Sequence, residues 1–295
     1  MLQLLKGLFG SAGRVNLDKR FSIACETPQG SMSRVYRATD KVSGRTVCLK
    51  IQIPDKQTAA ESRAHRTARP PEGEIATMVV HPNVVRTYEY GITTEGEGFL
   101  VMEFIDGVSF KFVREATNTG LRAKVNLLAQ AADSLAAVHA AGFIHHDVNP
   151  NNFLVNRDNE VKLIDFGLAV PNTAAFHRPG NRTGMIQYMA PELIRRESTD
   201  ERLDIFGFGV MAYEMLIGKL PFGGGNSLTQ LTQKINTPPM DPVLANPRIS
   251  DDLRNILLKT LARRKDDRWP KMSTLAKALY EVNPRREAKS EAEAS

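Results

Sequence analysis

The chain is poor in cysteine: of its 295 residues only two are cysteine, Cys25 and Cys48. Two thiols so far apart in the sequence provide neither a disulfide framework nor a metal-ligand spacing, so a reducing compartment, the cytoplasm, is expected. Each thiol is expected to be a small buried apolar residue rather than a nucleophile.

Long apolar runs are also missing. No segment approaches the roughly 20 apolar residues that a membrane-spanning helix needs, so no transmembrane segment is expected. The N-terminal extension, residues 1–20, is not expected to be a signal peptide, because Lys6 interrupts it and no cleavage-like end follows. Its apolar residues recur at helical spacing: Leu2, Leu5, Leu8 and Phe9. We expect a short amphipathic helix packed on the body of the protein, or alternatively a weak contact with a membrane surface or a partner.

A concentrated block of one charge is absent as well. The formal net charge is +6, but the lysines and arginines are spread along the chain, so nucleic-acid binding is not expected. A hydrophobic content of 42% with 24% charged residues is ordinary for a globular protein. The length fits one large two-lobed domain or two modest domains.

The first half of the chain, about residues 21–105, has the composition and turn spacing of β-strands joined in an antiparallel sheet. The strand-like stretches are "FSIACET", "SRVYRATD", "TVCLKIQI", "VVRTYEYGI" and "GFLVMEFI". Two helix-compatible segments, residues 59–68 and 72–80, interrupt them and are divided by Pro70 and Pro71.

The second half, about residues 106–282, has helical periodicity. The longest helical segment, residues 122–142, ends at Gly142, and its apolar face consists of Val125, Leu128, Ala132, Leu135 and Val138. Residues 203–218 are typical of a buried helix, and residues 250–263 of a helix capped by Ser250. The tail, residues 283–295, has no apolar face and is expected to be disordered.

Four motifs follow one another in a fixed order: "TVCLKI", "HHDVNPNN", "VKLIDFGLA", and "GMIQYMAPE" with "DIFGFGV" beyond it. Together they resemble the eukaryotic-type protein kinase family, in its serine/threonine form, over residues 21–282. The resemblance implies an α+β, bilobal fold with a small antiparallel β-rich N-lobe and a larger, mainly helical C-lobe. It also implies ATP and Mg²⁺ as cofactors and a protein substrate.

The resemblance assigns roles to individual residues. Lys50 matches the lysine that grips the α and β phosphates and pairs with a glutamate of the following helix. Glu72 is the gapless match for that glutamate, and Glu74 remains an alternative because the start of the helix is irregular. Asp147 matches the base at the substrate hydroxyl, and Asn152 and Asp165 match the Mg²⁺ ligands.

Such a set suits phosphoryl transfer, because this reaction needs charge neutralisation and alignment more than covalent chemistry. The resemblance also places the residues around the adenine ring: Val35 and Cys48 above it, Leu154 below it, Met102 at the back, and the backbone of Glu103 and Ile105 as hydrogen-bonding groups. It implies two structural contacts, an ion pair between Glu192 and Arg268 and a link from Asp204 to the backbone of the "HHD" loop.

The sequence departs from the family pattern in the phosphate-covering loop, "PQGSMSRV". Only Gly30 remains there, while Pro28 and Ser33 occupy positions where glycine is expected. Glycine lets backbone N–H groups approach phosphate closely, so weaker nucleotide binding is expected.

The loop around Asp147 departs as well. His146 replaces an arginine, Asn149 replaces the lysine that contacts the γ-phosphate, and Met185 replaces the threonine that accompanies that lysine. Loss of that charge-assisted hydrogen bond should weaken transition-state stabilisation by about 1 to 3 kcal/mol. The favoured function is an ATP-dependent protein kinase, acting on serine or threonine. The alternative is a pseudokinase, a nucleotide-binding or scaffolding module with weak or no transfer activity.

Overall fold

The computed structural model describes residues 14–27, 33–53, 69–116, 119–178, 184–223 and 234–282. The chain forms two compact units, and each is described by itself. The first consists of residues up to Val80 together with Val85–Ile105, and the second of His81–Val84 together with the chain from Asp106 onward. In the described ranges, no helix is long and apolar enough to cross a membrane.

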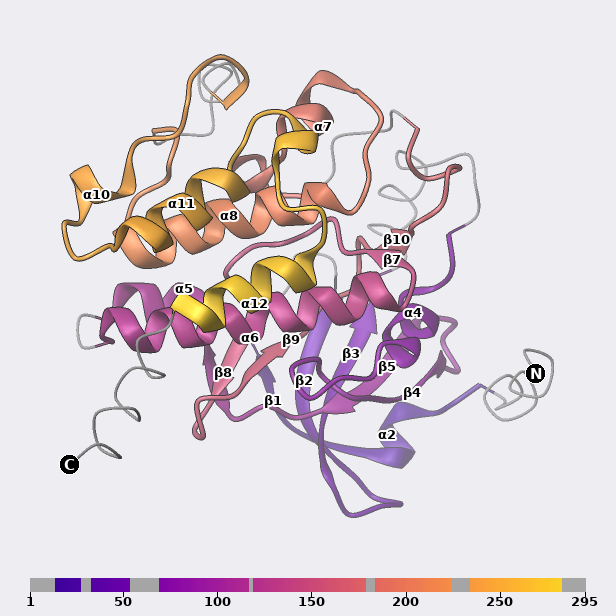
Figure 1. The fold of residues 1–295 in the computed structure, drawn as a ribbon. Coiled ribbons are helices and arrows are strands. Elements are labelled where there is room, and N and C mark those ends of the chain that lie inside the picture. The colour runs from indigo at the N-terminus through magenta and orange to yellow at the C-terminus, as the bar shows by residue number, and fades with distance from the viewer. Residues whose placement is uncertain are drawn as a thin grey trace. The chain divides into compact units, whose positions relative to one another are not determined.

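The first unit is built on a five-stranded antiparallel sheet, as the sequence predicted (Figure 1). The strands are β1 (Phe21–Thr27), β2 (Ser33–Asp40), β3 (Thr46–Gln52), β4 (Thr87–Ile92) and β5 (Gly98–Glu103). Their order across the sheet is β1-β2-β3-β5-β4. The expectation that both cysteines are buried is wrong for Cys25, which is exposed on β1, a strand whose residues are mostly exposed.

The register of the sheet separates two faces, because directly opposed residues of an antiparallel pair share a face. Lys50 lies opposite Val35 on one side and Leu100 on the other. The opposite face carries the apolar core of the unit, which comprises Phe21, Ala38, Val47, Leu49, Ile51, Phe99 and Val101. The alternation along β3 therefore places Lys50 on the face away from that core.

A short helix, α4 (Glu72–Met78), begins directly after Pro71. It packs on β4, and Gly73 makes this close approach possible: a Cβ at Gly73 would lie 2.3 Å from Cγ of Tyr90. The core side of this helix carries Ile75, which is fully buried. The other predicted helical segment, residues 59–68, lies outside the described residues.

The segment before β1 is attached to the first unit at two places. Val15 forms a parallel bridge with Thr93 beside β4. After it, α2 (Leu17–Arg20) ends at Arg20, which binds Glu89 through two hydrogen bonds of 2.8 and 2.7 Å. The helix predicted from Leu2 to Phe9 lies outside the described residues, as does the tail beyond residue 282.

The second unit is mainly helical, as the sequence predicted. Its α-helices in the described ranges are α5 (Phe110–Glu115), α6 (Leu121–Ala140), α7 (Pro191–Arg195), α8 (Arg202–Ile217), α10 (Pro242–Ala245), α11 (Asp251–Thr260) and α12 (Met272–Val282). Short strands accompany them: β6 (Gly107–Ser109), β7 (Phe143–Ile144), β8 (Phe153–Asn156), β9 (Val161–Leu163) and β10 (Val170–Pro171). Two 3₁₀ turns, η1 (Ile186–Tyr188) and η2 (Lys265–Asp267), complete the list.

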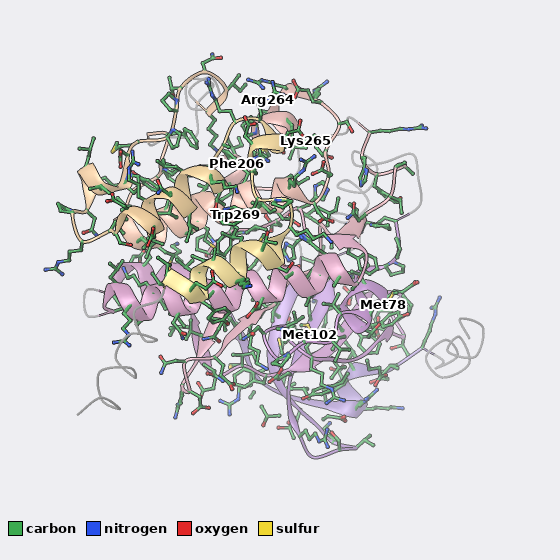
Figure 2. All side chains as sticks on the ribbon, in the orientation of Figure 1. Met78, Met102, Phe206, Arg264, Lys265 and Trp269 are labelled. Carbon is green, nitrogen blue, oxygen red and sulfur yellow. The ribbon has the colours of Figure 1, made fainter. Side chains whose placement is uncertain are left out.

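The helix α8 is the centre of this unit, because almost every one of its residues is buried. Phe206 on α8, which Figure 2 labels, is fully buried. Its ring stacks on that of Phe222, with ring centroids 5.9 Å apart. The predicted apolar face of α6 is buried throughout, and Gly142 with a φ of 86° follows the end of that helix. α12 packs along α6 (Figure 1). Ser250 caps α11 as predicted, accepting a hydrogen bond from the Leu253 N–H.

Candidate active site

The loop at residues 145–152, between β7 and β8, carries the candidate catalytic residues. Asp204 in the first turn of α8 anchors this loop: its carboxylate accepts hydrogen bonds from the N–H groups of His145 and His146, at 2.7 and 2.9 Å. The predicted link from Asp204 to the loop backbone is therefore confirmed. Burial alone would raise the pKa of Asp204, but the hydrogen bond with His139 at 2.8 Å and the neighbouring histidines keep it below its ordinary value. The anchor consequently stays charged.

His146 adopts a left-handed backbone conformation, with a φ of 65°. This region is unfavourable for a residue with a Cβ and persists where surrounding contacts enforce it. Here the enforcing contact is the charge-assisted hydrogen bond from its N–H to Asp204. The resulting turn directs the chain into Asp147.

Asp147 and Asn152 are in direct contact. The amide nitrogen of Asn152 donates to the Asp147 carbonyl at 2.8 Å and to its carboxylate at 2.9 Å. Burial raises the pKa of Asp147 above its ordinary value; His145 and the bond from Asn152 oppose this only in part, and the charge of Asp165 adds to it. A carboxylate with a raised pKa is a stronger proton acceptor, which suits a group that takes the proton of a hydroxyl.

Asn149 is folded into the same loop, and its exposed fraction is only 3%. Its amide nitrogen donates to the Asp147 carbonyl at 3.2 Å, and its side-chain oxygen accepts from the Asn151 N–H at 3.0 Å. The side chain thus shapes the loop through an Asx turn. The weaker transition-state stabilisation expected from the replacement of lysine by Asn149 stays a prediction.

Asp165 follows β9 and lies beside the same loop. The N–H of Ile164 donates to the Asn152 carbonyl at 3.0 Å, and one carboxylate oxygen of Asp165 accepts from the Gly167 N–H at 2.7 Å. Phe166 is buried and packs on His145, with ring centroids 5.6 Å apart. Asn152 and Asp165 are thereby brought together.

These two side chains fit Mg²⁺. The Asn152 amide nitrogen is directed at Asp147, which leaves the amide oxygen for a ligand role, and amide and carboxylate oxygens are the protein ligands that Mg²⁺ prefers. Across the described ranges, no group of three or more histidine, cysteine, aspartate or glutamate residues could hold a metal ion. Mg²⁺ in phosphate-transferring sites needs only one or two protein ligands together with the substrate phosphates.

Lys50 on β3 forms a buried ion pair with Glu72, the first residue of α4, with 2.6 Å between Nζ and Oε1. Gln52 donates to the other oxygen of Glu72 at 3.1 Å. Glu74 is exposed. Of the two candidate partners that the sequence left open, the structure pairs Lys50 with Glu72.

Several residues predicted to surround the adenine ring share the sheet face of Lys50. Cys48 lies two residues before Lys50 and directly opposite Met102, which Figure 2 labels on the first unit. Burial raises the pKa of the Cys48 thiol to about 11, so the thiol is neutral and behaves as an apolar side chain. With Val35, which lies opposite Lys50, these residues form a largely apolar row beside a charged amine.

The remaining predicted nucleotide-binding residues are placed separately. The N–H of Glu103 donates to the Arg86 carbonyl at 2.8 Å, and Ile105 is the last residue of the first unit. Leu154 is half-buried on β8 of the second unit. Gly30 lies outside the described residues.

Gly184 is a residue of the site that the sequence did not single out. It has a φ of 87°, and a Cβ there would lie 2.9 Å from the His146 carbonyl oxygen and 3.4 Å from a carboxylate oxygen of Asp147. The segment that begins at Gly184 therefore runs against the catalytic loop. The only sequence signal for this close approach is the glycine immediately before Met185, and a glycine by itself does not predict such an approach.

Two ion pairs, Arg268–Glu192 and Arg114–Glu214, fix the chain at and beyond the end of this segment. Arg268 binds Glu192 through two hydrogen bonds of 2.7 Å, which confirms the predicted pair. Glu214 on α8 accepts a hydrogen bond from the Tyr188 hydroxyl at 2.6 Å and another from Arg114 at 2.5 Å. The sequence did not reveal the contacts of Glu214, because its partners are 26 and 100 residues away.

Comparison with known proteins agrees with this geometry. The chain belongs to the protein kinase domain family, which it matches over residues 26–280.

Several curated bacterial relatives are similar to it. It is 33% identical to a probable serine/threonine-protein kinase, pknA2, of Bifidobacterium longum over 75% of this chain and 29% of the relative. It is 32% identical to the serine/threonine-protein kinase Pkn1 of Myxococcus xanthus over 88% of this chain and 38% of the relative. It is 31% identical to PknA of Mycobacterium tuberculosis over 91% and 62%. The chain thus spans less than two thirds of the length of each of these relatives.

Proposed function

We propose that this chain is an ATP-dependent protein kinase that transfers the γ-phosphoryl group to serine or threonine hydroxyls of a protein. The observation that carries the proposal is the contact of Asn152 with Asp147, in a loop whose backbone also holds the strand leading to Asp165. These contacts place a proton acceptor and two oxygen ligands for a metal ion next to one another. The relatives named as serine/threonine kinases support the choice of hydroxyl.

In this proposal each residue has one task. Asp147 accepts the proton of the substrate hydroxyl. Lys50, kept in place by Glu72, binds the phosphates, and Asn152 with Asp165 would hold Mg²⁺. The metal ion, when bound, neutralises charge on the phosphate oxygens. The adenine ring would contact Val35, Cys48, Met102, Leu154 and the backbone of Glu103 and Ile105, and Gly30 belongs to the loop that would cover the phosphates.

The proposed compartment is the cytoplasm. Both cysteines of the sequence are free thiols, and one of them is exposed. Free thiols are typical of proteins in a reducing compartment. The N-terminal extension remains the proposed place for a weak contact with a membrane surface or a partner.

Transfer of radiolabelled γ-phosphate from Mg·ATP to casein tests the function. We expect the wild type to label casein on serine or threonine, as shown by phosphoamino-acid analysis. Lys50→Met should lower the rate by about 10²-fold, because it removes a fixed positive charge from the phosphates. Lys277→Met, on an exposed side chain of α12, is the control and should not change the rate. Equal labelling by the wild type and Lys50→Met would refute the proposal.

The second candidate function is a nucleotide-responsive scaffold without transfer activity. The specific observation in its favour is Asn149, whose amide is engaged inside the loop at the position where the family has a charged lysine. A thermal-shift measurement separates the two. A wild type that is stabilised by Mg·ATP but labels no substrate would be a scaffold of this kind.

The charge deficit at Asn149 leads to a further prediction. We expect Asn149→Lys to raise the transfer rate about tenfold, because an ammonium group would add a charge-assisted hydrogen bond to the γ-phosphate. The measurement is the initial rate at saturating Mg·ATP. Asn151→Lys, on the exposed neighbour, adds the same charge and should leave the rate unchanged. If Asn149→Lys and Asn151→Lys change the initial rate equally, the missing charge that limits transfer does not lie at position 149.

A further inference from the structure

A buried lysine holds the segment that runs past the catalytic loop. Lys234 has an exposed fraction of 1%. Its Nζ donates to the Ile186 carbonyl at 2.6 Å and also to the Gln187 carbonyl. Both acceptors belong to the 3₁₀ turn η1, which is 47 and 48 residues away in sequence.

The charge of Lys234 has no compensating acid among the residues that the structure describes. Within the described part of the chain, no aspartate or glutamate forms an ion pair with it, and burial lowers its pKa to about 7. Two positive charges lie at the next residue: Arg195 and Arg263 both donate to the carbonyl of Ile235, at 3.1 and 3.5 Å. An uncompensated buried amine is unfavourable for folding, and an apolar residue of the same length would be less costly. The benefit of lysine at this position therefore has to come from the two carbonyls that it binds.

The segment that Lys234 binds starts at the general base. Gly184 approaches the His146 carbonyl and the Asp147 carboxylate so closely that even a Cβ would be crowded. The next residue, Met185, is 41% exposed. A protein chain whose hydroxyl reaches Asp147 must therefore lie next to the exposed side of this segment.

The far end of the segment is fixed as well, because the Tyr188 hydroxyl donates to Glu214 on α8 at 2.6 Å. Gly184 and Tyr188 thus define the two ends, and the carbonyls of Ile186 and Gln187 lie between them. Lys234 binds both carbonyls and so ties this middle part to the body of the second unit. Without its donors, the middle of the segment loses that tie while both ends remain attached.

We propose that Lys234 is a positioning residue for the protein substrate: it holds residues 184–188 in the form against which the substrate chain binds beside Asp147. This inference rests on the proposed kinase function. It concerns substrate binding rather than the chemical step, because Lys234 acts through the carbonyls of η1 and does not itself contact Asp147, Asn152 or Asp165 within the described structure.

The test measures the KM for a peptide substrate and the KM for ATP separately. Lys234→Met keeps the length of the side chain and removes its donors. We expect the KM for a peptide substrate to rise about tenfold, with kcat and the KM for ATP changed less than about twofold, as for loss of an interaction that serves substrate binding alone. Lys234→Arg keeps the donors and should recover most of the peptide affinity. Lys277→Met is the matched control on an exposed lysine.

If Lys234→Met does not fold, as judged by its circular dichroism spectrum, Lys234→Gln takes its place, since its shorter amide keeps a neutral donor. An intermediate rise in peptide KM is then expected. A peptide KM within twofold of the wild type, or peptide and ATP KM values that rise together, would overturn the inference while an active wild type leaves the kinase function standing. A wild type that transfers no phosphate would remove the kinase function first, and the inference with it.

Discussion

Replacing Asp147 with asparagine should lower the rate of phosphoryl transfer by about 10³-fold, because a positioned general base typically contributes 10²- to 10⁴-fold. The substitution is nearly isosteric. Its side-chain oxygen can still accept the hydrogen bond from Asn152, so the loop should keep its shape while losing the proton acceptor. The measurement is the initial rate of labelled phosphate transfer at saturating ATP and peptide.

A matched control distinguishes loss of the base from loss of structure. Asp158→Asn makes the same chemical change on an exposed turn between β8 and β9 and should leave the rate unchanged. Stabilisation of the Asp147→Asn variant by Mg·ATP should also persist, since binding does not require the base. A rate within tenfold of the wild type would mean that Asp147 is not the proton acceptor.

Removing Glu192 should cause the largest loss of stability. Glu192→Ala leaves the Arg268 guanidinium buried without its carboxylate, and breaking a buried ion pair in this way costs about 3 to 5 kcal/mol in the free energy of unfolding. Arg268 cannot move to solvent easily, because it also donates to the carbonyls of Ala262 and Arg202 and lies over the ring of Phe206. Urea denaturation followed by circular dichroism measures the loss.

The control for this prediction is Glu197→Ala, which removes an exposed glutamate just beyond the end of α7 and should change the free energy of unfolding by less than about 0.5 kcal/mol. A loss below about 1 kcal/mol for Glu192→Ala would show that solvent reaches Arg268 and that the pair is not buried in solution.

The fold was largely predictable because its signals are local. β1 and β2 occupy the predicted residues, and α6 begins within a residue of the predicted segment and ends two residues before the predicted Gly142. In each case the pattern of apolar residues, the turn residues or the cap lies within the element itself. Cys25 was the exception: thiols are usually buried, but this one lies on a strand at the edge of the sheet, whose outer residues face solvent.

The candidate site was only partly predictable. The family resemblance assigned the expected base to Asp147 and the expected metal ligands to Asn152 and Asp165, and the structure places Asn152 in contact with Asp147 and Asp165 beside their loop. This proximity was predictable because loop and strand follow each other closely in the chain. The partner of Lys50 could not be chosen, because the choice depends on where α4 begins and how closely Gly73 lets it approach β4. The inward orientation of Asn149 could not be predicted from the sequence either, because an Asx turn depends on the backbone conformation of its own loop.

The family, the order of the elements and the set of candidate catalytic residues could be predicted from the sequence alone. These features depend on motifs and on periodicities of two or 3.6 residues, which are local properties of the chain. Three contacts became known only from the three-dimensional arrangement: Glu72 rather than Glu74 binds Lys50, Gly184 lies against Asp147, and Lys234 binds η1. Contacts between side chains and backbone groups more than 20 residues apart depend on packing, and no local pattern encodes them.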